Sequence, residues 1–468
     1  MKKIFLFSVF CIAVSLNGFA TKATTTYSSG SFSPTINSFN QTTLDTLVVV
    51  SATATDYISL ENLRSIRTKF VTAGDSRNGK FTLDLSAVAF ENNILPGGSA
   101  VEAGAFFQMN CLKEVILPNG LKQIGNYTFR YCAYLAKINL PDGLEVIGDR
   151  AFAMGTTGLL VLTSMPNTIK KIDQYAFYAQ TSLGLTSLPN SITEIYPNTF
   201  YGAKVAISKI PEGVTVIEKG TFNCGNVAAR QLITSMDFPS TLTTLFTEAF
   251  RYQVNLKTLR FRTATPPFSG ATDPFLDGAT KSEITVWVPK GARGNYSSLT
   301  ALAGTSIKEA GTVTYYANSG SGDAPVEGEK IVGETFAAAA NTFTAPSGKV
   351  FVRWNTQSNG NGSNYAAGAT ITPVAGSGGD TESITLYAVW DDATGVNAAK
   401  EASVKVWTLG DRLHIQADKN SNDVKLFDLT GRLLETLPAN TSSHDISRLS
   451  RGVYILQVDD ASVKFTKQ

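Results

Sequence analysis

The chain has 468 residues, of which 43% are hydrophobic and 17% are charged. This length is enough for about three domains, and the composition favours a large buried core over disorder. With 40 Lys and Arg residues against 38 Asp and Glu residues, the chain is nearly neutral. Its charge therefore gives no reason to expect nucleic acid or an anionic membrane surface as a partner.

Residues 1–20 are predicted to be a secretory signal peptide. Two lysines precede an apolar run, and Ala20 is the small residue expected before the cleavage site. The apolar run is too short to span a bilayer. A lipoprotein anchor at Cys11 is the alternative, but Phe10 stands where such anchors need a small residue. We expect an exported protein with no membrane insertion after cleavage, beginning with an N-terminal linker over 21–43.

A frame of thirteen residues then recurs six times, as in LPNGLKQIGNYTF at 117–129 and LPDGLEVIGDRAF at 140–152. Each copy has a proline at its second position: Pro118, Pro141, Pro166, Pro189, Pro211 and Pro239. Each copy ends with a phenylalanine: Phe129, Phe152, Phe177, Phe200, Phe222 and Phe250. A worn copy precedes them, with Val101 and Phe106 at the usual spacing. Such a fixed period is the signature of a solenoid, in which stacked copies bury their apolar faces on one another.

The segment before each proline is predicted to be a short strand. Apolar and other residues alternate towards the end of these segments, as at 112–117, 135–140 and 256–261. Proline cannot donate to a ladder, so each strand should end there. We therefore predict a mainly β protein with a solenoid of parallel short strands.

The pattern LxxVxLPxGLxxIGxxAF resembles the BspA-like class of leucine-rich repeat, which is found on bacterial surface proteins. The resemblance covers about residues 80–300, and ITVWVPKGARGNYSSL at 284–299 resembles the end cap of such arrays. It implies a leucine-rich repeat solenoid with caps over residues 44–310. It specifies the fold strongly and the ligand hardly at all.

Three cysteines lie inside the repeats: Cys111, Cys132 and Cys224. Three is an odd number, and the three positions share no common register, which is typical of buried thiols that fill the coil. A disulfide between Cys111 and Cys132 is the alternative.

Residues 311–390 are predicted to form a small β-grasp-like module, because Gly and Ser clusters separate short aromatic runs. The segment resembles the Listeria–Bacteroides repeat of internalin B-type surface proteins, although Lys349 and Arg353 depart from the usual Tyr and Gly. The matching positions are Gly348, Phe351, Trp354, Gly360, Gly362, Tyr365, Leu386, Tyr387, Ala388 and Trp390. The resemblance implies a spacer or a weak binding module. Trp354 and Trp390 are interpreted as core residues, not as a carbohydrate platform.

A linker is expected over 391–402, and residues 403–468 are predicted to form a β-sandwich of alternating strands and Gly-containing turns. The signature positions are Val424, Leu426, Phe427, Asp428, Leu429, Gly431, Arg432, Gly452, Val453, Tyr454 and Ile455. They resemble the C-terminal sorting domain of the type IX secretion system. The resemblance implies passage through the outer membrane and a location at the cell surface or outside the cell. An ordinary terminal sandwich used in assembly is the alternative.

Catalysis needs titratable groups held in a pocket, and the sequence offers few. Its two histidines, His414 and His444, both lie in the predicted sandwich, where His414 reads as an exposed strand residue. A solenoid without histidine excludes a Ser-His-Asp triad, a Cys-His pair and a histidine zinc site there. No GxSxG, HExxH, phosphate-loop or EF-hand motif occurs. We predict no catalysis, no cofactor and no metal site. An enzyme that works through carboxylates alone is the remaining catalytic alternative.

A solenoid without catalytic residues offers an extended, rigid surface, which favours binding. We predict an adhesin-like surface protein whose repeats bind a protein of the host or of neighbouring bacteria. The alternative is a glycan-binding or glycan-processing accessory protein of the cell envelope. That alternative needs exposed aromatic residues on the strand face, and the positions two and four before the prolines carry no Trp, Tyr or Phe.

The expected docking face follows from strand alternation, which points the residues two and four before each proline outward. The outer column then contains three aliphatic residues in succession, Leu162, Leu185 and Ile207, which would form an exposed apolar stripe. The neighbouring column is a polar rim: Asn139, Ser164, Ser187, Lys209, Asp237 and Arg260. In the alternative, a bulge turns the apolar column inward and places Thr163, Thr186 and Ser208 outside.

Overall fold

The computed structural model describes residues 21–27, 44–71, 78–100, 104–155, 158–225, 227, 231–268, 275–392, 404–417, 424–459 and 461–467. The expected signal peptide at 1–20 lies outside these residues. The chain divides into two compact units. The first contains the residues up to 313 together with 328–335 and 372–384, and the second contains the others.

A parallel sheet with a helix forms the N-terminal part of the first unit. The strand order is β1-β2-β3-β5-β7. The bounds are β1 (Thr21–Tyr27), β2 (Leu44–Ser51), β3 (Phe81–Ala87), β5 (Leu112–Ile116) and β7 (Lys137–Ile138). The helix α2 (Leu60–Phe70) is capped by the side chain of Ser59 and buries Leu63, Ile66 and Phe70.

The prediction of a linker over 21–43 is wrong for residues 21–27. These residues form β1, which pairs with β2 along its whole length. A threonine-rich segment suits a strand because β-branched side chains pack well on a pleated surface, and Thr25 and Tyr27 are buried. The sheet therefore has one strand more at its N-terminal end than we predicted from the sequence.

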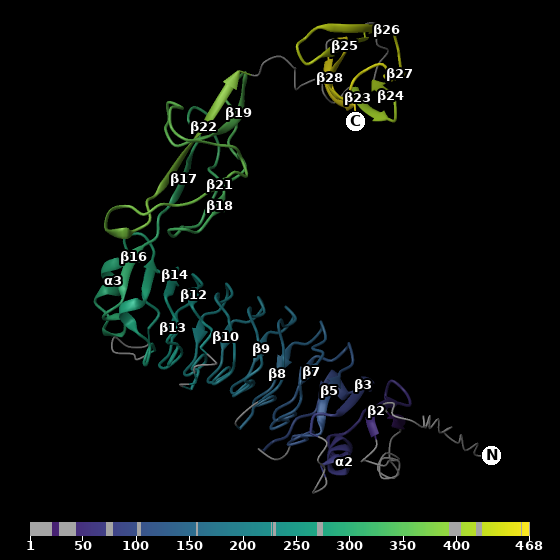
Figure 1. Ribbon diagram of the computed structural model, residues 1–468, viewed down its shortest axis with the longest axis vertical. Coiled ribbons are helices and arrows are strands. Elements are labelled where there is room, and N and C mark those ends of the chain that lie inside the picture. The colour runs from purple at the N-terminus through teal and green to yellow at the C-terminus, as the bar shows by residue number, and fades with distance from the viewer. Residues whose placement is uncertain are drawn as a thin grey trace, which may run out of the picture. The chain divides into compact units, whose positions relative to one another are not determined.

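Two further parallel ladders run along the solenoid and, apart from the first strand, β4, join the segments between each repeat proline and the following phenylalanine. The first part is β4 (Ile94–Leu95), β6 (Gln123–Ile124), β8 (Val146–Ile147) and β9 (Lys171–Ile172). It is followed by β10 (Glu194–Ile195), β11 (Val216–Ile217) and β13 (Thr244–Leu245). The second residue of every strand is buried. In Figure 1 these coils lie one behind another along the blue and teal part of the ribbon.

The closing phenylalanines form a continuous stack through the core. Neighbouring ring centroids from Phe106 to Phe250 lie 5.2–5.7 Å apart. Phe106 stacks on Phe129 like the others, at 5.3 Å, as the predicted worn copy requires. Val101 lies outside the described residues, and Leu95 is the residue that pairs with Ile124. A single apolar cluster spans the described part of the first unit from Tyr27 to Leu302.

The C-terminal end of the solenoid is a third parallel sheet with a short helix. Its strands are β12 (Ser235–Phe238), β14 (Thr258–Phe261), β15 (Thr285–Val288) and β16 (Ser306–Glu309), followed in the chain by β17 (Val313–Tyr316). The helix α3 (Arg293–Ser297) follows β15 and buries Tyr296. The end cap expected at 284–299 contains a strand and a short helix, but this strand is not the last of the sheet, because β16 pairs beyond β15. Short 3-10 helices are η1 (Glu91–Asn93), η3 (Lys281–Glu283), η4 (Thr300–Leu302) and η5 (Ser377–Gly379).

The region after the solenoid is antiparallel. A four-stranded sheet has the order β17-β22-β19-β20, and β18 pairs with β21. The bounds are β18 (Phe336–Ala337), β19 (Lys349–Asn355), β20 (Asn364–Tyr365), β21 (Thr370–Ile371) and β22 (Ile384–Asp392). Trp354 is fully buried and donates to the Ala339 carbonyl at 2.8 Å, as a core residue should. Trp390 is half-buried and donates to the Ala317 carbonyl at 2.7 Å.

The division predicted at residue 310 does not match the compact units. Segments 328–335 and 372–384 belong to the first unit. Gly311 and Lys330 form an antiparallel bridge, and the Asp380 side chain accepts from the Glu309 amide at 2.9 Å. These contacts join residues about 20 to 70 positions apart in the chain, which local sequence patterns do not report.

The last region of the chain is a β-sandwich, as predicted. One sheet is β23 (Val404–Leu409), β24 (Arg412–Ala417) and β27 (Ser443–Asp445). The other is β26 (Leu433–Leu437), β25 (Val424–Asp428), β28 (Gly452–Val458) and β29 (Ala461–Lys467). Residues of both sheets share one buried apolar cluster. His414 is half-buried against the Trp407 ring, 5.4 Å away, and was expected to be exposed. Within the described residues, no helix is long and apolar enough to cross a membrane.

Candidate binding face of the solenoid

We number the repeats 1 to 6 by their prolines, from Pro118 to Pro239. In repeats 1, 2 and 6, the residues six, three and one before the proline point inward, as Leu112, Val115 and Leu117 do. Repeats 3 to 5 differ, because the residue four before the proline points inward in place of the residue three before it. Leu162, Leu185 and Ile207 are 7%, 0% and 0% exposed.

The prediction that Leu162, Leu185 and Ile207 form an exposed docking stripe is therefore wrong. The predicted alternative is confirmed, because Thr163, Thr186 and Ser208 are exposed in their place. The physical reason is that burying three hydroxyls and exposing three aliphatic side chains would cost free energy twice. The strand alternation is therefore interrupted by a bulge-like irregularity. In repeat 3, for example, Thr163 and Ser164 both point outward, between the inward residues Leu162 and Met165.

The face that solvent meets in repeats 3 to 5 consists of three outward columns. The column five before the proline is small or apolar, and Val161 in it is 51% exposed beside Leu159 at 42%. The second column consists of the exposed hydroxyls Thr163, Thr186 and Ser208. The third contains the exposed residues Ser164, Ser187 and Lys209, and Asn139 precedes them in repeat 2. We call these three columns the strand face.

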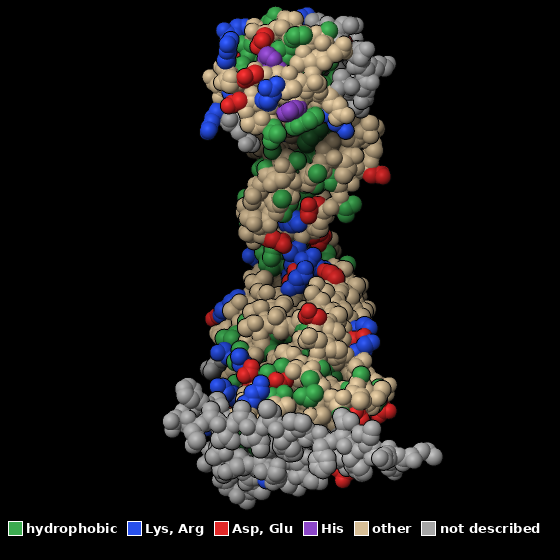
Figure 2. Space-filling view, turned by 90° about the vertical axis from the view of Figure 1, so that its right-hand side faces the viewer, with side chains coloured by type: hydrophobic (Ala, Val, Ile, Leu, Met, Phe, Trp, Pro, Cys, Tyr) green, Lys and Arg blue, Asp and Glu red, His purple; other side chains and the backbone are tan. Residues whose placement is uncertain are grey.

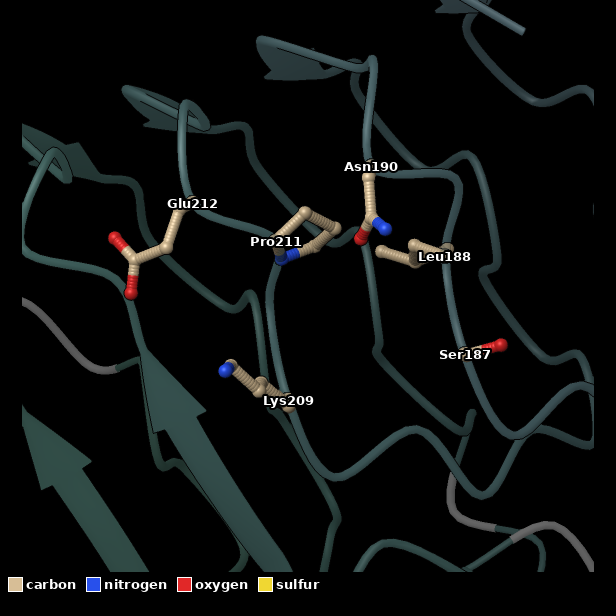
Figure 3. A pocket seen from close by; sticks show the side chains of 6 residues that line it. All are labelled: Ser187, Leu188, Asn190, Lys209, Pro211 and Glu212. Carbon is tan, nitrogen blue, oxygen red and sulfur yellow. The ribbon is translucent and has the colours of Figure 1, made fainter. Parts of the chain in front are cut away.

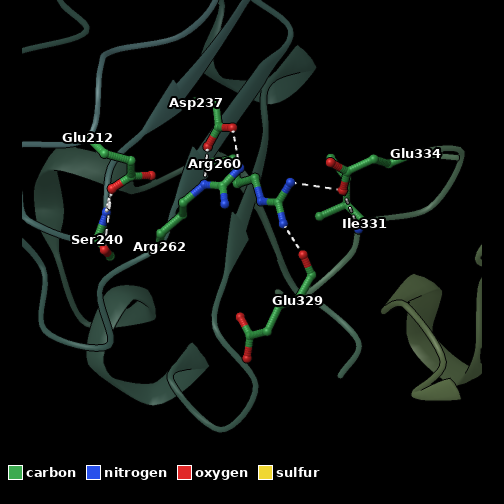
Figure 4. A network of polar contacts seen from close by, with 8 residues as sticks. All are labelled: Glu212, Asp237, Ser240, Arg260, Arg262, Glu329, Ile331 and Glu334. Atoms are coloured by element: carbon green, nitrogen blue, oxygen red, sulfur yellow. Dashed lines mark hydrogen bonds and ion pairs between the residues drawn. The ribbon is translucent and has the colours of Figure 1, made fainter. Parts of the chain in front are cut away.

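The two remaining members of the predicted polar rim are engaged within the protein. Arg260 is 6% exposed, and its guanidinium binds Glu334 at 2.8 Å and the Glu329 carbonyl. Its assignment to a binding face is therefore wrong. Asp237 is half-buried and holds Arg262 through two hydrogen bonds of 2.9 and 2.7 Å, which raises the pKa of Arg262. Figure 4 shows both pairs side by side.

Three shallow hollows lie along the strand face between neighbouring repeats. One of about 360 Å³ is lined by Ser187, Leu188, Asn190, Lys209, Pro211 and Glu212, whose side chains Figure 3 shows around its rim. A second of about 360 Å³ separates repeats 2 and 3, from Ile138 to Pro166. A third of about 330 Å³ extends from Ser208 to Glu334. Hollows of this kind fit single side chains of a partner better than a whole small molecule.

Charged side chains of both signs are interspersed on the described surface in Figure 2. Several pair from one repeat to the next. Glu145 receives Lys170 at 2.8 Å and Lys122 at 3.9 Å, and the hydrogen bond from Lys170 lowers the pKa of Glu145. Exposed pairs of this kind contribute little to stability, and their mixed signs do not favour a polyanionic ligand.

A row of tyrosines and arginines on the turns beside the phenylalanine stack was missed by the sequence analysis. Successive groups lie 4.2–5.9 Å apart, measured between ring centroids or from a guanidinium carbon to a ring centroid. The row is Phe107, Tyr131, Arg130, Tyr127, Arg150, Tyr175, Tyr178 and Tyr201. Tyr127, Arg150 and Tyr175 all lie two residues before the phenylalanine with φ of 52–59°. That shared position was the available signal.

The thiols of the solenoid are buried. Cys111, Cys132 and Cys224 are buried thiols, which agrees with the predicted filling of the coil and not with a Cys111–Cys132 disulfide. Burial raises the pKa of the Cys132 thiol, which donates to the Phe106 carbonyl at 2.9 Å, so the thiol is unreactive. Among the described residues, no group of three or more His, Cys, Asp and Glu side chains is arranged to hold a metal ion.

Comparison with known families decides the class of the repeats. Residues 99–224 and 156–268 match the BspA type leucine rich repeat region, in six copies. The solenoid is a BspA-type leucine-rich repeat array. Residues 409–468 match the secretion system C-terminal sorting domain, and they lie in the antiparallel sandwich. A sorting domain of this kind indicates secretion to the cell surface.

Solved structures similar to this chain include leucine-rich repeat proteins of two bacteria. One from Eubacterium ventriosum is 20% identical, with 47% of this chain and 67% of that chain covered and a TM-score of 0.30. One from Bacteroides ovatus is 16% identical, with 57% and 70% covered and a TM-score of 0.30. The pneumococcal vaccine antigen PcpA is 14% identical, with 56% and 78% covered and a TM-score of 0.25. These scores are low, so the assignment rests on the repeat frame. No curated protein matches the chain.

Proposed function

We propose that this BspA-type protein is an adhesin-like protein of the cell surface that binds a protein of the host or of neighbouring bacteria through the strand face. The observation that carries the proposal is the make-up of repeats 3 to 5. Exposed Val161 and Leu159 lie beside columns of exposed hydroxyls, and Val161 lines one of the hollows. An apolar centre with a polar surround is typical of protein-binding surfaces.

Two further features support a binding role. The strand face is rigid, because every inward residue beneath it is fixed in the solenoid core. The sorting domain at 409–468 would carry this face to the outside of the cell, where a protein partner is accessible. The signal peptide at 1–20 and the linker at 391–402 remain part of this proposal, as does the spacer role of the module over 311–390.

The glycan-binding alternative has less support from the same surface. Sugar rings stack on free aromatic faces, and the outward columns of repeats 3 to 5 contain no aromatic residue. The tyrosines on the turns have ring faces that neighbouring groups cover, as in the stacked pair Tyr178 and Tyr201 at 5.1 Å. The proposed function is also non-catalytic, since carboxylates near the strand face, such as Asp237 and Glu334, hold arginines.

The test compares two matched variants of the chain from residue 21 onward, both replacing an exposed threonine by lysine. Thr186 lies in the middle of the strand face, and Thr193 lies outside it. Binding is measured against immobilised extracellular-matrix proteins and purified surface proteins of neighbouring bacteria. We expect Thr186→Lys to weaken binding at least about tenfold, because it buries an unpaired charge in the interface, and Thr193→Lys to bind like the parent. Equal binding by both variants would contradict the proposal.

A further inference from the structure

The main chain of the strand face pairs between repeats at Val161, Gly184 and Ala206. Close to the prolines, it is paired at some repeat boundaries and unpaired at others. Between repeats 1 and 2, the side chain of Asn139 closes the contact. Its Oδ1 accepts from the Leu117 amide at 2.6 Å, and its Nδ2 donates to the Leu117 carbonyl at 2.9 Å. Both main-chain groups of the residue before Pro118 are therefore satisfied by the residue two before Pro141.

The three following boundaries lack this contact. The residues equivalent to Asn139 are Ser164, Ser187 and Lys209, and none of their side chains forms a hydrogen bond to another described residue. The main chain next to Ser164 and Ser187 is unpaired as well. Seven residues form no hydrogen bond, from main chain or side chain, within the described part of the chain: Leu140, Thr163, Ser164, Met165, Thr186, Ser187 and Leu188. We call these seven residues the open strip.

The interruption is local, since pairing resumes further along the solenoid. Ile210 donates to the Asp237 carbonyl and Asp237 to the Ser208 carbonyl, each at 2.9 Å. Strands β12 and β14 then pair over four residues. The two hollows of about 360 Å³ both lie along the open strip, one beside Leu140 and Ser164 and the other beside Ser187 and Leu188.

The strip is neutral and contains both donors and acceptors. No side chain of the open strip carries a charge, and exposed Val161 lies next to it. A glycan would lack an aromatic platform here, and a polyanion would lack cations. An extended polypeptide supplies alternating N–H and C=O groups, which is what an unpaired strand segment accepts.

We propose that the open strip binds the main chain of an extended, uncharged polypeptide segment of a partner protein, and that aliphatic side chains of this segment contact Val161 and enter the hollows. The inference rests on the proposed function and names the part of the ligand that the strand face recognises. Recognition through the main chain differs from recognition through side chains in one respect. The affinity depends on main-chain N–H and C=O groups of the open strip, which remain when a side chain is truncated.

The sharpest test supplies the missing contact. In the double variant Ser164→Asn and Ser187→Asn, the new amides are placed to pair with Leu140 and Met165 as Asn139 pairs with Leu117. Thr193→Asn makes the same change at an exposed hydroxyl outside the strip. The probe is a linear peptide selected from a phage-displayed random library against the unmodified chain from residue 21 onward.

We expect the double variant to lose peptide affinity at least about tenfold, with an unchanged or higher melting temperature, and Thr193→Asn to bind like the parent. N-methylation of alternate peptide bonds in the probe should also abolish binding, and the amides of Thr163 and Thr186 should gain protection from hydrogen exchange when the probe is bound. If the double variant does not fold, the main-chain contact is tested on the unmodified chain alone, by the N-methylated probe and by the hydrogen-exchange measurement.

Two results would overturn the inference. One is full peptide affinity in a folded double variant, or full affinity of the N-methylated probe. The other is a library that yields no binding peptide while a glycan array yields a ligand that the double variant loses. Loss of binding to whole proteins in Thr186→Lys, together with full binding in the double variant, would leave the proposed function standing and refute only the main-chain contact. No effect of either variant would refute both.

Discussion

Replacing Phe177 by alanine removes the central ring of the phenylalanine stack. The ring is fully buried and lies between Phe152 at 5.4 Å and Phe200 at 5.7 Å, with interplanar angles of 8° and 4°. Truncating a core phenylalanine costs about 3–5 kcal/mol. Two stacked pairs are lost at once, and each contributes about 0.5–1.5 kcal/mol beyond its buried area. We therefore expect a loss in the upper half of the range, about 4–5 kcal/mol.

The assay is thermal and urea unfolding of the chain from residue 21 onward, followed by circular dichroism. For a folding unit of this size, each kcal/mol lowers Tm by about 2 °C, so Tm should fall by about 8–10 °C. Phe246→Ala is the control, because this phenylalanine is only half-buried and should cost less than about 2 kcal/mol.

A Phe177→Ala variant that melts within about 2 °C of the parent would refute the reasoning. It would mean that the stacked rings do not hold the repeats together. A variant that melts in two steps would show that the cavity divides the solenoid into separately folding halves, since each repeat contacts only its neighbours.

Three further outcomes are expected. Leu185→Ser should lower the Tm of the solenoid by several degrees, because it leaves a cavity and a buried hydroxyl; an unchanged Tm would mean that Leu185 is not in the core. Burial raises the pKa of Tyr296 to about 12, above the value of about 10 in the unfolded chain, so its contribution is complete below pH 10 and is lost as the pH rises towards 12. Urea unfolding at pH 8 and pH 11 should show this decline, and Tyr296→Phe should reduce it. Deleting residues 403–468 should abolish display on the native host's surface, measured by protease accessibility on intact cells, while the solenoid still folds; continued display would show that the sorting domain is dispensable.

The repeat frame could be predicted because its positions impose strong local constraints. The proline of each copy ends a strand segment, and the phenylalanine fills the same core position in every coil. The direction of Leu162 and its two equivalents was harder, because a period of two fits either register. The sequence nevertheless contained the deciding fact: a hydroxyl follows the aliphatic residue in all three repeats, and burying it is unfavourable.

Other features depend on residues far apart in the chain, and the sequence pattern does not report them. Strand β1 pairs with β2 across an intervening segment of the chain, so 21–27 looked like a linker. Arg260 occupies an outward position in its strand, and only the return of Glu329 and Glu334 to this place buries it. The tyrosine and arginine row was missed because Tyr127, Arg150 and Tyr175 share a position and a positive φ, and not a residue type.

The open strip is compatible with a stable solenoid because other parts of each coil join the repeats. On one side, β8 pairs with β9 and β10 with β11, where Asp173 donates to the Ile147 carbonyl and Glu218 to the Ile195 carbonyl, each at 2.9 Å. Between β9 and β10 this ladder is interrupted, and Phe177 donates to the Thr199 carbonyl at 2.9 Å instead. In the core, the phenylalanine rings stack without interruption. The main chain of the open strip is therefore free to be hydrated, and a ligand that replaces this water needs no unfolding of the protein. In repeats 3 and 4 the register change turned Leu162 and Leu185 inward, and it left Thr163 and Thr186 outside with no hydrogen bond to the described chain.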